Sequence, residues 1–343
     1  MNPERKGIIS AGNWVVDSVK FIDVLPEKGN LTTIRRVEEG GGGCSHNVLL
    51  DLAALKCGLP LYAGGCIGND EIGKASCNDD PGKMLLDELE VSGIDHSNMK
   101  ILDGEATSYT DVMTEPGGAR TFFHNRGANA RLSVEDVLSC KTDAKIFHLG
   151  YLLLLDELDK DDPDYGIVAA RVLDGLLKMG YKTSVDVVSE QGDRFQHVVK
   201  PCLKYTDYLI FNEVEAGACL GRDLRKADGT IDPEDVASAA AELMACGIRE
   251  LVLIHFPEGG YALSKDGTGC YADSFSPPKS EIVSTVGAGD AFCAGALYAI
   301  HEGYSLRDTL DFANASARFN LFNPTSTGGA PEIGTIQEFL KTR

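Results

Sequence analysis

The segment STVGAGDAF, Ser284–Phe292, combines a glycine-rich turn with an acid at the expected start of a helix. Gly287 and Gly289 permit a tight turn with uncovered N–H groups, and the small, apolar residues that follow are typical of a buried helix. Such N–H groups attract phosphate oxygens, so the negative charge of Asp290 needs another role. A carboxylate beside a bound phosphate can accept the proton of an attacking hydroxyl group, which is the chemistry of phosphoryl transfer to an alcohol. The alternative is that Asp290 only caps the helix.

A second glycine-rich stretch, GGGGCSHN at Gly40–Asn47, precedes another helical pattern. It lacks the third glycine of a dinucleotide-binding fingerprint, so we do not expect a nicotinamide enzyme. The run lets a small ligand approach the backbone closely, and the amide of Asn47 can both donate and accept hydrogen bonds, as vicinal hydroxyl groups require. The alternative is a glycine turn in which Asn47 caps the helix.

A third stretch, GNDEIGKA at Gly68–Ala75, nearly matches the P-loop pattern. It fails where Ala75 replaces the hydroxyl residue that binds magnesium, and Asp70 and Glu71 stand where phosphate oxygens would lie. We therefore do not predict a P-loop.

Composition excludes several classes of protein. The 343 residues include 32 Lys and Arg against 52 Asp and Glu, a net charge of −20, without a basic cluster, so no nucleic acid partner is expected. No apolar run approaches the roughly 18 residues of a membrane span, and the first residues lack a signal-peptide core, so we expect no membrane and a cytoplasmic location. Ten cysteines without a C-x-x-C pair and seven histidines without zinc-ligand spacing indicate reduced thiols and no protein cluster of metal ligands.

The hydrophobic pattern predicts an α/β fold with a doubly wound, mostly parallel sheet flanked by helices. Asp232 as cap, Pro233 in the first turn and Gly247 past the end define one helix. A turn, PGGA, is expected to join two strands of a hairpin. The expected strands are 6–26, 31–39, 107–115, 120–126, 145–155, 182–188, 207–212, 249–256 and 280–286, and the expected helices are 47–55, 81–93, 165–180, 232–247 and 291–300.

Together these segments resemble the ribokinase-like (PfkB-type) carbohydrate kinases over some 280 residues. The matching stretches, in the family's order, are GNWVVD, GGCSHN, IGNDEIG, NEVE and VGAGDAF. The resemblance implies that Asp290 is the catalytic base and that Gly287, Ala288 and Gly289 form an anion hole. It assigns sugar binding to Asp17, Gly42, Gly43 and Asn47, and assigns the region of magnesium and phosphate to Asn212 and Glu215.

The resemblance also implies a single ribokinase-like domain over 1–343, with ATP and Mg²⁺ as cofactors. Lid strands at about 14–37 and 105–126 form a small β-sheet over the sugar, which the family often uses for homodimer contacts. Two positions depart from the pattern: Pro257 replaces a glycine near the nucleotide, and Ser284 replaces an aspartate of the monovalent-cation site, which leaves K⁺ activation open.

The expected activity is ATP-dependent phosphorylation of a primary hydroxyl group of a small sugar. A nucleoside acceptor is one alternative, with Trp14, Phe122 and Phe123 as aromatic walls for the base. A sugar acid or sugar phosphate is another, with an anion bound by Arg120, His124 and Arg126. A non-catalytic sugar sensor is the alternative from a different class of protein.

Overall fold

A nine-stranded sheet forms the centre of the protein, whose computed structural model describes residues 5–69, 80–189 and 194–343. Its strand order is β15-β14-β13-β12-β11-β8-β1-β4-β5, and the pairs from β12–β13 to β4–β5 are parallel. The strands are β1 (Ile8–Gly12), β4 (Leu61–Asn69), β5 (Asp95–Asp103), β8 (Ile146–Leu152), β11 (Lys182–Val187), β12 (Tyr208–Asn212), β13 (Leu251–Phe256), β14 (Gly259–Ser264) and β15 (Gly269–Asp273).

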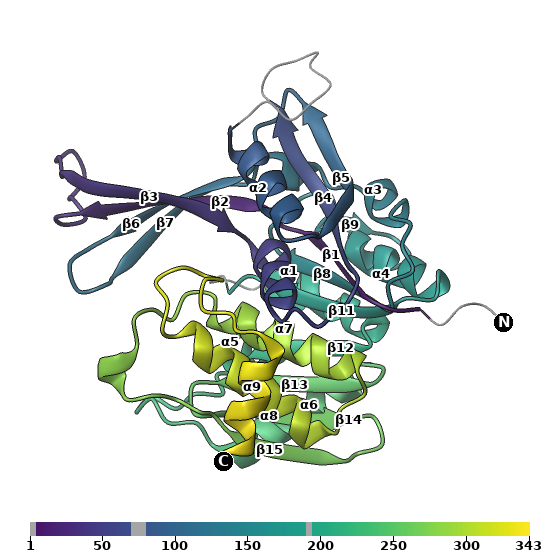
Figure 1. The fold of residues 1–343 in the computed structure, drawn as a ribbon. Helices are drawn as coiled ribbons and strands as arrows, with labels where there is room; N and C mark the ends of the chain where they lie inside the picture. The colour runs from purple at the N-terminus through teal and green to yellow at the C-terminus, as the bar shows by residue number, and fades with distance from the viewer. Residues whose placement is uncertain (1–4, 70–79, 190–193) are drawn as a thin grey trace.

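Helices pack on both faces of this sheet (Figure 1). One apolar core lies beneath α1, α2, α7, α8 and α9, and the other beneath α3 to α6. The sheet is thereby buried on both sides, as its continuous apolar strands require. The helices are α1 (Cys44–Ala54), α2 (Asp80–Val91), α3 (Val134–Leu138), α4 (Val168–Lys178), α5 (Glu213–Leu220), α6 (Pro233–Ala245), α7 (Ala288–His301), α8 (Leu306–Asn320) and α9 (Ile333–Lys341). Among the helices of the described ranges, none is long and apolar enough to cross a bilayer.

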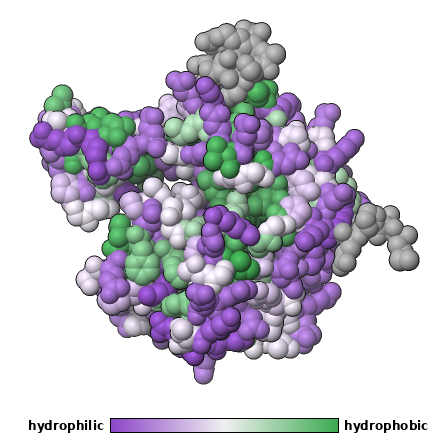
Figure 2. Space-filling model, viewed as in Figure 1, coloured by the Kyte–Doolittle hydropathy of each residue, from purple (hydrophilic) through white to green (hydrophobic). Residues whose placement is uncertain are grey.

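A second sheet of four strands, which we call the lid sheet, projects from one side of the protein in Figure 1. Its order is β3-β2-β6-β7, with β2 parallel to β6 and the other pairs antiparallel. Some of its apolar side chains are exposed, and they form part of the green surface on this arm in Figure 2. The strands are β2 (Val15–Ile22), β3 (Ile34–Gly42), β6 (Tyr109–Thr114) and β7 (Arg120–Asn125), and a two-stranded ribbon is formed elsewhere by β9 (Asp161–Asp162) and β10 (Gly166–Ile167).

The predicted α/β class, the mostly parallel sheet and the small lid sheet are confirmed. The hairpin of β6 and β7 is also confirmed. Asp232 caps α6 by accepting a hydrogen bond from the N–H of Glu234, Pro233 occupies the first turn, and Gly247 follows the helix with φ 112°. Local capping chemistry therefore located this helix correctly.

The prediction of a strand at 280–286 is wrong. Only a short 3-10 turn, Lys279–Glu281, forms there, and Val283 is 60% exposed. The sheet continues past β13 through the antiparallel strands β14 and β15, so it offers this β-branched run no neighbour in the sheet. The segment instead pairs with the end of α8, where the carbonyl oxygen of Leu321 accepts from the N–H of Val283 at 2.8 Å. It leads directly into the glycine turn before α7.

Candidate active site

A cavity of about 180 Å³ lies where the carboxyl ends of β11 and β12 meet the N-terminus of α7. This is the edge of a parallel sheet at which ligands usually bind. The lining residues combine the glycine turn, three carboxylates, an amide and two aromatic or imidazole rings. They are Tyr151, Asp186, Val187, Ser189, Ile210, Asn212, Glu215, His255, Gly287, Gly289, Asp290 and Cys293.

The glycine turn precedes α7 as expected. Gly287 is the residue before the helix and has φ 77°, and a β-carbon there would lie 2.1 Å from the carbonyl oxygen of Ser326. Only glycine fits this position without strain. Ala288 and Gly289 are the first two residues of α7. The backbone N–H groups of this first turn have no acceptor within the helix. An anion at this position would meet several donors.

Asp290 is the third residue of α7, whereas the cap position is occupied by Gly287. Its Oδ2 accepts a hydrogen bond of 2.7 Å from Nδ2 of Asn47. The Oδ1 of Asn47 in turn accepts from the hydroxyl group of Ser326 at 3.1 Å. Asn47 lies inside α1 rather than at its cap, which is Gly43. The two predicted motifs are thus joined through these side chains, 243 residues apart.

A buried histidine extends this connection. Nδ1 of His46 lies 3.2 Å from Oδ1 of Asn47, and Nε2 lies 2.6 Å from a carboxylate oxygen of Glu88 on α2. Burial raises the pKa of Asp290 to about 6, while the hydrogen bond from Asn47 and the charge of His46 act in the opposite direction. Asp290 therefore changes its ionisation near neutral pH, as a general base requires.

Asp17, Gly42 and Gly43 also lie together. Asp17 is on β2 of the lid sheet, and a β-carbon on Gly42 would lie 2.6 Å from its Oδ2. A β-carbon on Gly43 would lie 2.6 Å from the carbonyl oxygen of Asn13, so both glycines permit close approach of neighbouring chain. Burial raises the pKa of Asp17, opposed by a hydrogen bond from Thr110. The negative charge of Asp17 also contributes to the raised pKa of Asp290.

The N-x-x-E motif has a local structural role. The Oδ1 of Asn212 caps α5 by accepting from the N–H groups of Val214 and Glu215, both at 2.9 Å. Glu215 accepts from the N–H of Asn212 at 3.0 Å, which completes a capping box. The hydroxyl group of Ser189 donates to Oε1 of Glu215 at 2.7 Å. The cap fixes both side chains at the wall of the cavity.

Three carboxylates, those of Asp186, Glu215 and Asp290, line the same cavity, and no Lys or Arg stands among the described lining residues. Burial raises the pKa of Glu215 to about 7. It also raises the pKa of Asp186, as do the charges of Glu215 and Asp290. Three acids in one enclosed space favour a bound cation, and oxygen ligands of this kind suit Mg²⁺. The residues present therefore fit the magnesium ion that the resemblance implies.

A larger cavity of about 410 Å³ adjoins the first and shares Asn212, His255 and Gly289 with it. Its other walls include Phe256, Pro257, Phe275, Ile282, Phe292 and Leu321. Pro257 does line this space, and its carbonyl oxygen accepts hydrogen bonds from Ser274 and Ser276. Ser284 offers no carboxylate, and its hydroxyl group accepts from the N–H of Val286 at 3.1 Å.

The aromatic and basic residues that could contact an acceptor differ in burial and in their partners. Trp14 is fully buried and donates from its indole to the carbonyl oxygen of Gly64 at 2.8 Å, so it is no wall for a base. Arg126 pairs with Asp156. Phe122 and Phe123 are 62% and 54% exposed.

The register of the lid sheet sets Asp17 opposite Thr110 and Thr110 opposite His124. Nδ1 of His124 lies 3.0 Å from the hydroxyl group of Thr110. Because side chains alternate between faces, Arg120 shares this face with Asp17 and His124. The P-loop near-match Gly68–Ala75 and the stretch IGNDEIG lie mostly outside the described residues, whose first gap is 70–79.

Asp186, Tyr151 and His255 were not predicted from the sequence. The available signal was their position at or near the carboxyl ends of parallel strands, where polar residues face a ligand. Cys44, His148 and Asp186 also converge in space, a grouping that was not anticipated from the sequence. They come from separate elements, so linear spacing could not reveal them.

Comparison with known proteins identifies the family of the chain. The sequence model described as pfkB family carbohydrate kinase matches residues 10–333. A ribokinase of Schizosaccharomyces pombe is 24% identical over 338 residues, which cover 96% of each chain. An ATP-dependent ribose-1-phosphate kinase of Halopiger xanaduensis is 25% identical over 340 residues, covering 98% of each. The structure of Arabidopsis thaliana ribokinase complexed with ribose and ATP superposes with a TM-score of 0.76 at 21% identity, covering 98% of this chain and 99% of that one.

Proposed function

The chain belongs to the pfkB family of carbohydrate kinases, ATP-dependent phosphotransferases, and we propose that it phosphorylates a primary hydroxyl group of a small sugar. The observation that carries the proposal is the position of Asp290. Its carboxylate is held by Asn47 in a cavity beside the glycine turn of α7, so one group can accept a proton where the turn can bind phosphate. The similarity to ribokinases supports the same substrate class.

In this proposal the acceptor hydroxyl group gives its proton to Asp290 as it attacks the γ-phosphate of ATP. The N–H groups of Gly287, Ala288 and Gly289 stabilise negative charge on the transferring group. Asp186 and Glu215 would hold Mg²⁺, with Asn212 nearby, and the bound ion would supply positive charge beside the ATP oxygens. The adjoining apolar cavity takes the adenine and ribose of ATP.

On the other side of Asp290, Asp17 and Asn47 bind and orient the acceptor, and Gly42 and Gly43 let it approach the backbone. The lid sheet carries Asp17, so its position decides whether the acceptor is held. Covering the acceptor with this sheet excludes water that would otherwise intercept the phosphate.

A phosphorylated or acidic sugar is the second candidate acceptor. Arg120 and His124 share a lid face with Asp17, and a relative of nearly equal length is named a ribose-1-phosphate kinase. Arg120→Ala should then raise KM for an anionic acceptor about 10-fold to 100-fold, since a charge-assisted hydrogen bond contributes about 1.5–3 kcal/mol. The same KM effect on a neutral sugar would contradict anion recognition by Arg120.

The proposed function is tested by ADP release across pentoses, ketohexoses, sugar acids, sugar phosphates and nucleosides, with wild-type protein and Asp290→Asn. We expect one sugar class to stimulate ADP release, and Asp290→Asn to lower kcat about 10²-fold to 10⁴-fold, the range of a positioned general base. ATP should bind the variant at least as tightly, because the substitution removes one of the three carboxyl groups that line the cavity.

ATP affinity by calorimetry and the melting temperature serve as controls for this variant. A kcat within threefold of wild type at unchanged stability would remove Asp290 from the reaction. A protein that releases no ADP with any acceptor, while binding ATP and a sugar, would favour the non-catalytic sensor.

A further inference from the structure

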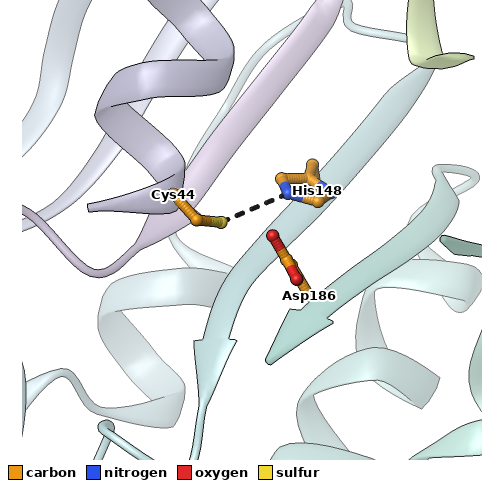
Figure 3. Close-up of side chains that lie close together, drawn as sticks. All are labelled: Cys44, His148 and Asp186. Atoms are coloured by element: carbon orange, nitrogen blue, oxygen red, sulfur yellow. Dashed lines mark hydrogen bonds between the residues drawn. The ribbon is translucent and has the colours of Figure 1, made fainter. Parts of the chain in front are cut away.

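Three side chains of metal-ligating type converge beneath the sheet edge that carries the cavity: Cys44, His148 and Asp186 (Figure 3). Cys44 opens α1, while His148 and Asp186 lie on the neighbouring strands β8 and β11. One potential ligand atom from each lies within 4.8 Å of the other two. Cys44 and His148 are fully buried. The functional proposal above gives neither of them a role.

The distances fit a tetrahedral metal centre. Sγ of Cys44 and Nε2 of His148 are 3.5 Å apart. A zinc ion with Zn–S of about 2.3 Å and Zn–N of about 2.0–2.1 Å places those two ligand atoms about 3.5 Å apart at a tetrahedral angle. The two atoms are therefore already spaced as two corners of such a centre require.

The imidazole of His148 is oriented for this role. Its Nδ1 lies 3.2 Å from the hydroxyl group of Ser184, the residue opposite it in the β8–β11 register. When Nδ1–H donates to that oxygen, Nε2 presents its lone pair toward Cys44, which is how outer-shell partners orient histidine ligands. One oxygen of Asp186 accepts from the N–H of Val187 at 2.7 Å, which fixes the carboxylate as well.

We propose that Cys44, His148 and Asp186 form a binding site for a thiophilic divalent cation of the Zn²⁺ type, with a fourth position left to water or another ligand. The thiol proton of Cys44 passes to solvent as the sulfur–metal bond forms. Thiolate and imidazole ligands select such an ion against Mg²⁺, which prefers oxygen ligands. The site is therefore chemically distinct from the carboxylates of the cavity.

Asp186 belongs to both places, because it also lines the cavity with Glu215 and Asp290. A cation held with Cys44 and His148 withdraws this carboxylate from the cavity. Occupancy should therefore inhibit the kinase, a consequence that rests on the proposed function.

The binding experiment uses Co²⁺ as a spectroscopic probe and Zn²⁺ as competitor on the full chain after removal of metal by a chelator. We expect one equivalent of Co²⁺ to give a thiolate-to-cobalt charge-transfer absorption in the near ultraviolet, and Zn²⁺ to displace it. Cys44→Ala should abolish the absorption. The matched control Cys140→Ala removes another buried thiol, outside the cluster, and should retain it.

Ser184→Ala keeps all three ligands and tests the site without removing one. It should weaken Co²⁺ binding about 10-fold to 100-fold, the usual effect of losing an outer-shell partner. The proposal is overturned if the wild-type protein shows no such absorption, if Cys44→Ala retains it, or if Cys293→Ala removes it instead. Melting curves identify any variant that has lost its fold.

The inhibition experiment measures ADP release with and without Zn²⁺ for wild type and Cys44→Ala, each relative to its own activity without Zn²⁺. Inhibition confined to wild type supports the shared role of Asp186, and equal inhibition of both proteins contradicts it. A cobalt absorption without kinase activity would count against the proposed function alone. Kinase activity without the absorption would count against the metal site alone.

Discussion

The two sides of the proposed site are built differently. The proposed phosphate side consists of strand ends of the central sheet and the first turn of α7, a helix whose residues from Ala291 to Ala299 are all buried. The proposed acceptor side includes Asp17, which stands on a four-stranded sheet projecting from the protein, with exposed Phe122 and Phe123 on its outer strand. Core packing therefore fixes the phosphate side, whereas the acceptor side can change with few consequences for the fold. We expect substrate choice to reside in the lid sheet and the start of α1.

We expect the largest difference between sugar binding and ATP binding from Asp17→Ala. It should raise the sugar KM about 10-fold to 100-fold, because a hydrogen bond to a charged group contributes about 1.5–3 kcal/mol. ATP affinity measured without sugar should stay near wild type. The matched control is Asp111→Ala on β6, which removes a lid carboxylate that pairs with Lys20 on the opposite face. Equal effects of the two substitutions on sugar KM would contradict the division of the site.

The pH dependence of kcat/KM probes the phosphate side. In the proposed mechanism Asp290 acts in its ionised form, and burial raises its pKa to about 6, so its contribution to kcat/KM should be lost as pH decreases through that value. The groups acting on it are Asn47 and His46, which lower its pKa, and Asp17, which raises it. Asp17→Ala should therefore move the acid limb to lower pH. Kinetics from about pH 5 to 8 measure this acid limb in wild type and in Asp17→Ala. An acid limb that is unchanged in Asp290→Asn belongs to another group.

The sequence predicted what depends on neighbouring residues. The caps of α6, the β6–β7 hairpin and the glycine turn before α7 follow from local backbone chemistry, which a few residues decide. The hydrogen bond between Asn47 and Asp290 was not predicted, because no pattern in one sequence joins residues so far apart; the resemblance only assigned each residue a role.

Long-range assembly explains what the sequence did not predict. Residues 280–286 have the β-branched composition of a strand, but whether a strand forms depends on a free sheet edge, and β14 occupies that place. Cys44, His148 and Asp186 meet only because the fold brings the start of α1 beside the neighbouring strands β8 and β11. The N-x-x-E motif had a structural explanation in sequence, a capping box, that the family resemblance obscured.

We expect the smallest effect, a change in stability, from substitution of Asp51. This buried acid lies outside the cavity and therefore serves as a control for both sides of the site. It lies on α1 at 4% exposure, and neither carboxylate oxygen has a hydrogen-bond partner within the described part of the chain. Burial raises its pKa well above 3.8 in the folded protein. As pH rises above 3.8, the unfolded chain loses this proton while the folded protein keeps it. The free energy of unfolding therefore decreases until pH passes the pKa of Asp51 in the folded protein. Asp51→Asn has no such proton, and should raise the melting temperature by about 1–2 °C near pH 8, corresponding to ~1 kcal/mol for a chain of this length, with a smaller gain near pH 4. Calorimetric melts at both pH values, beside the exposed control Asp87→Asn on α2, measure this difference. A gain of equal size at both pH values would show that relief of the buried charge is not its cause.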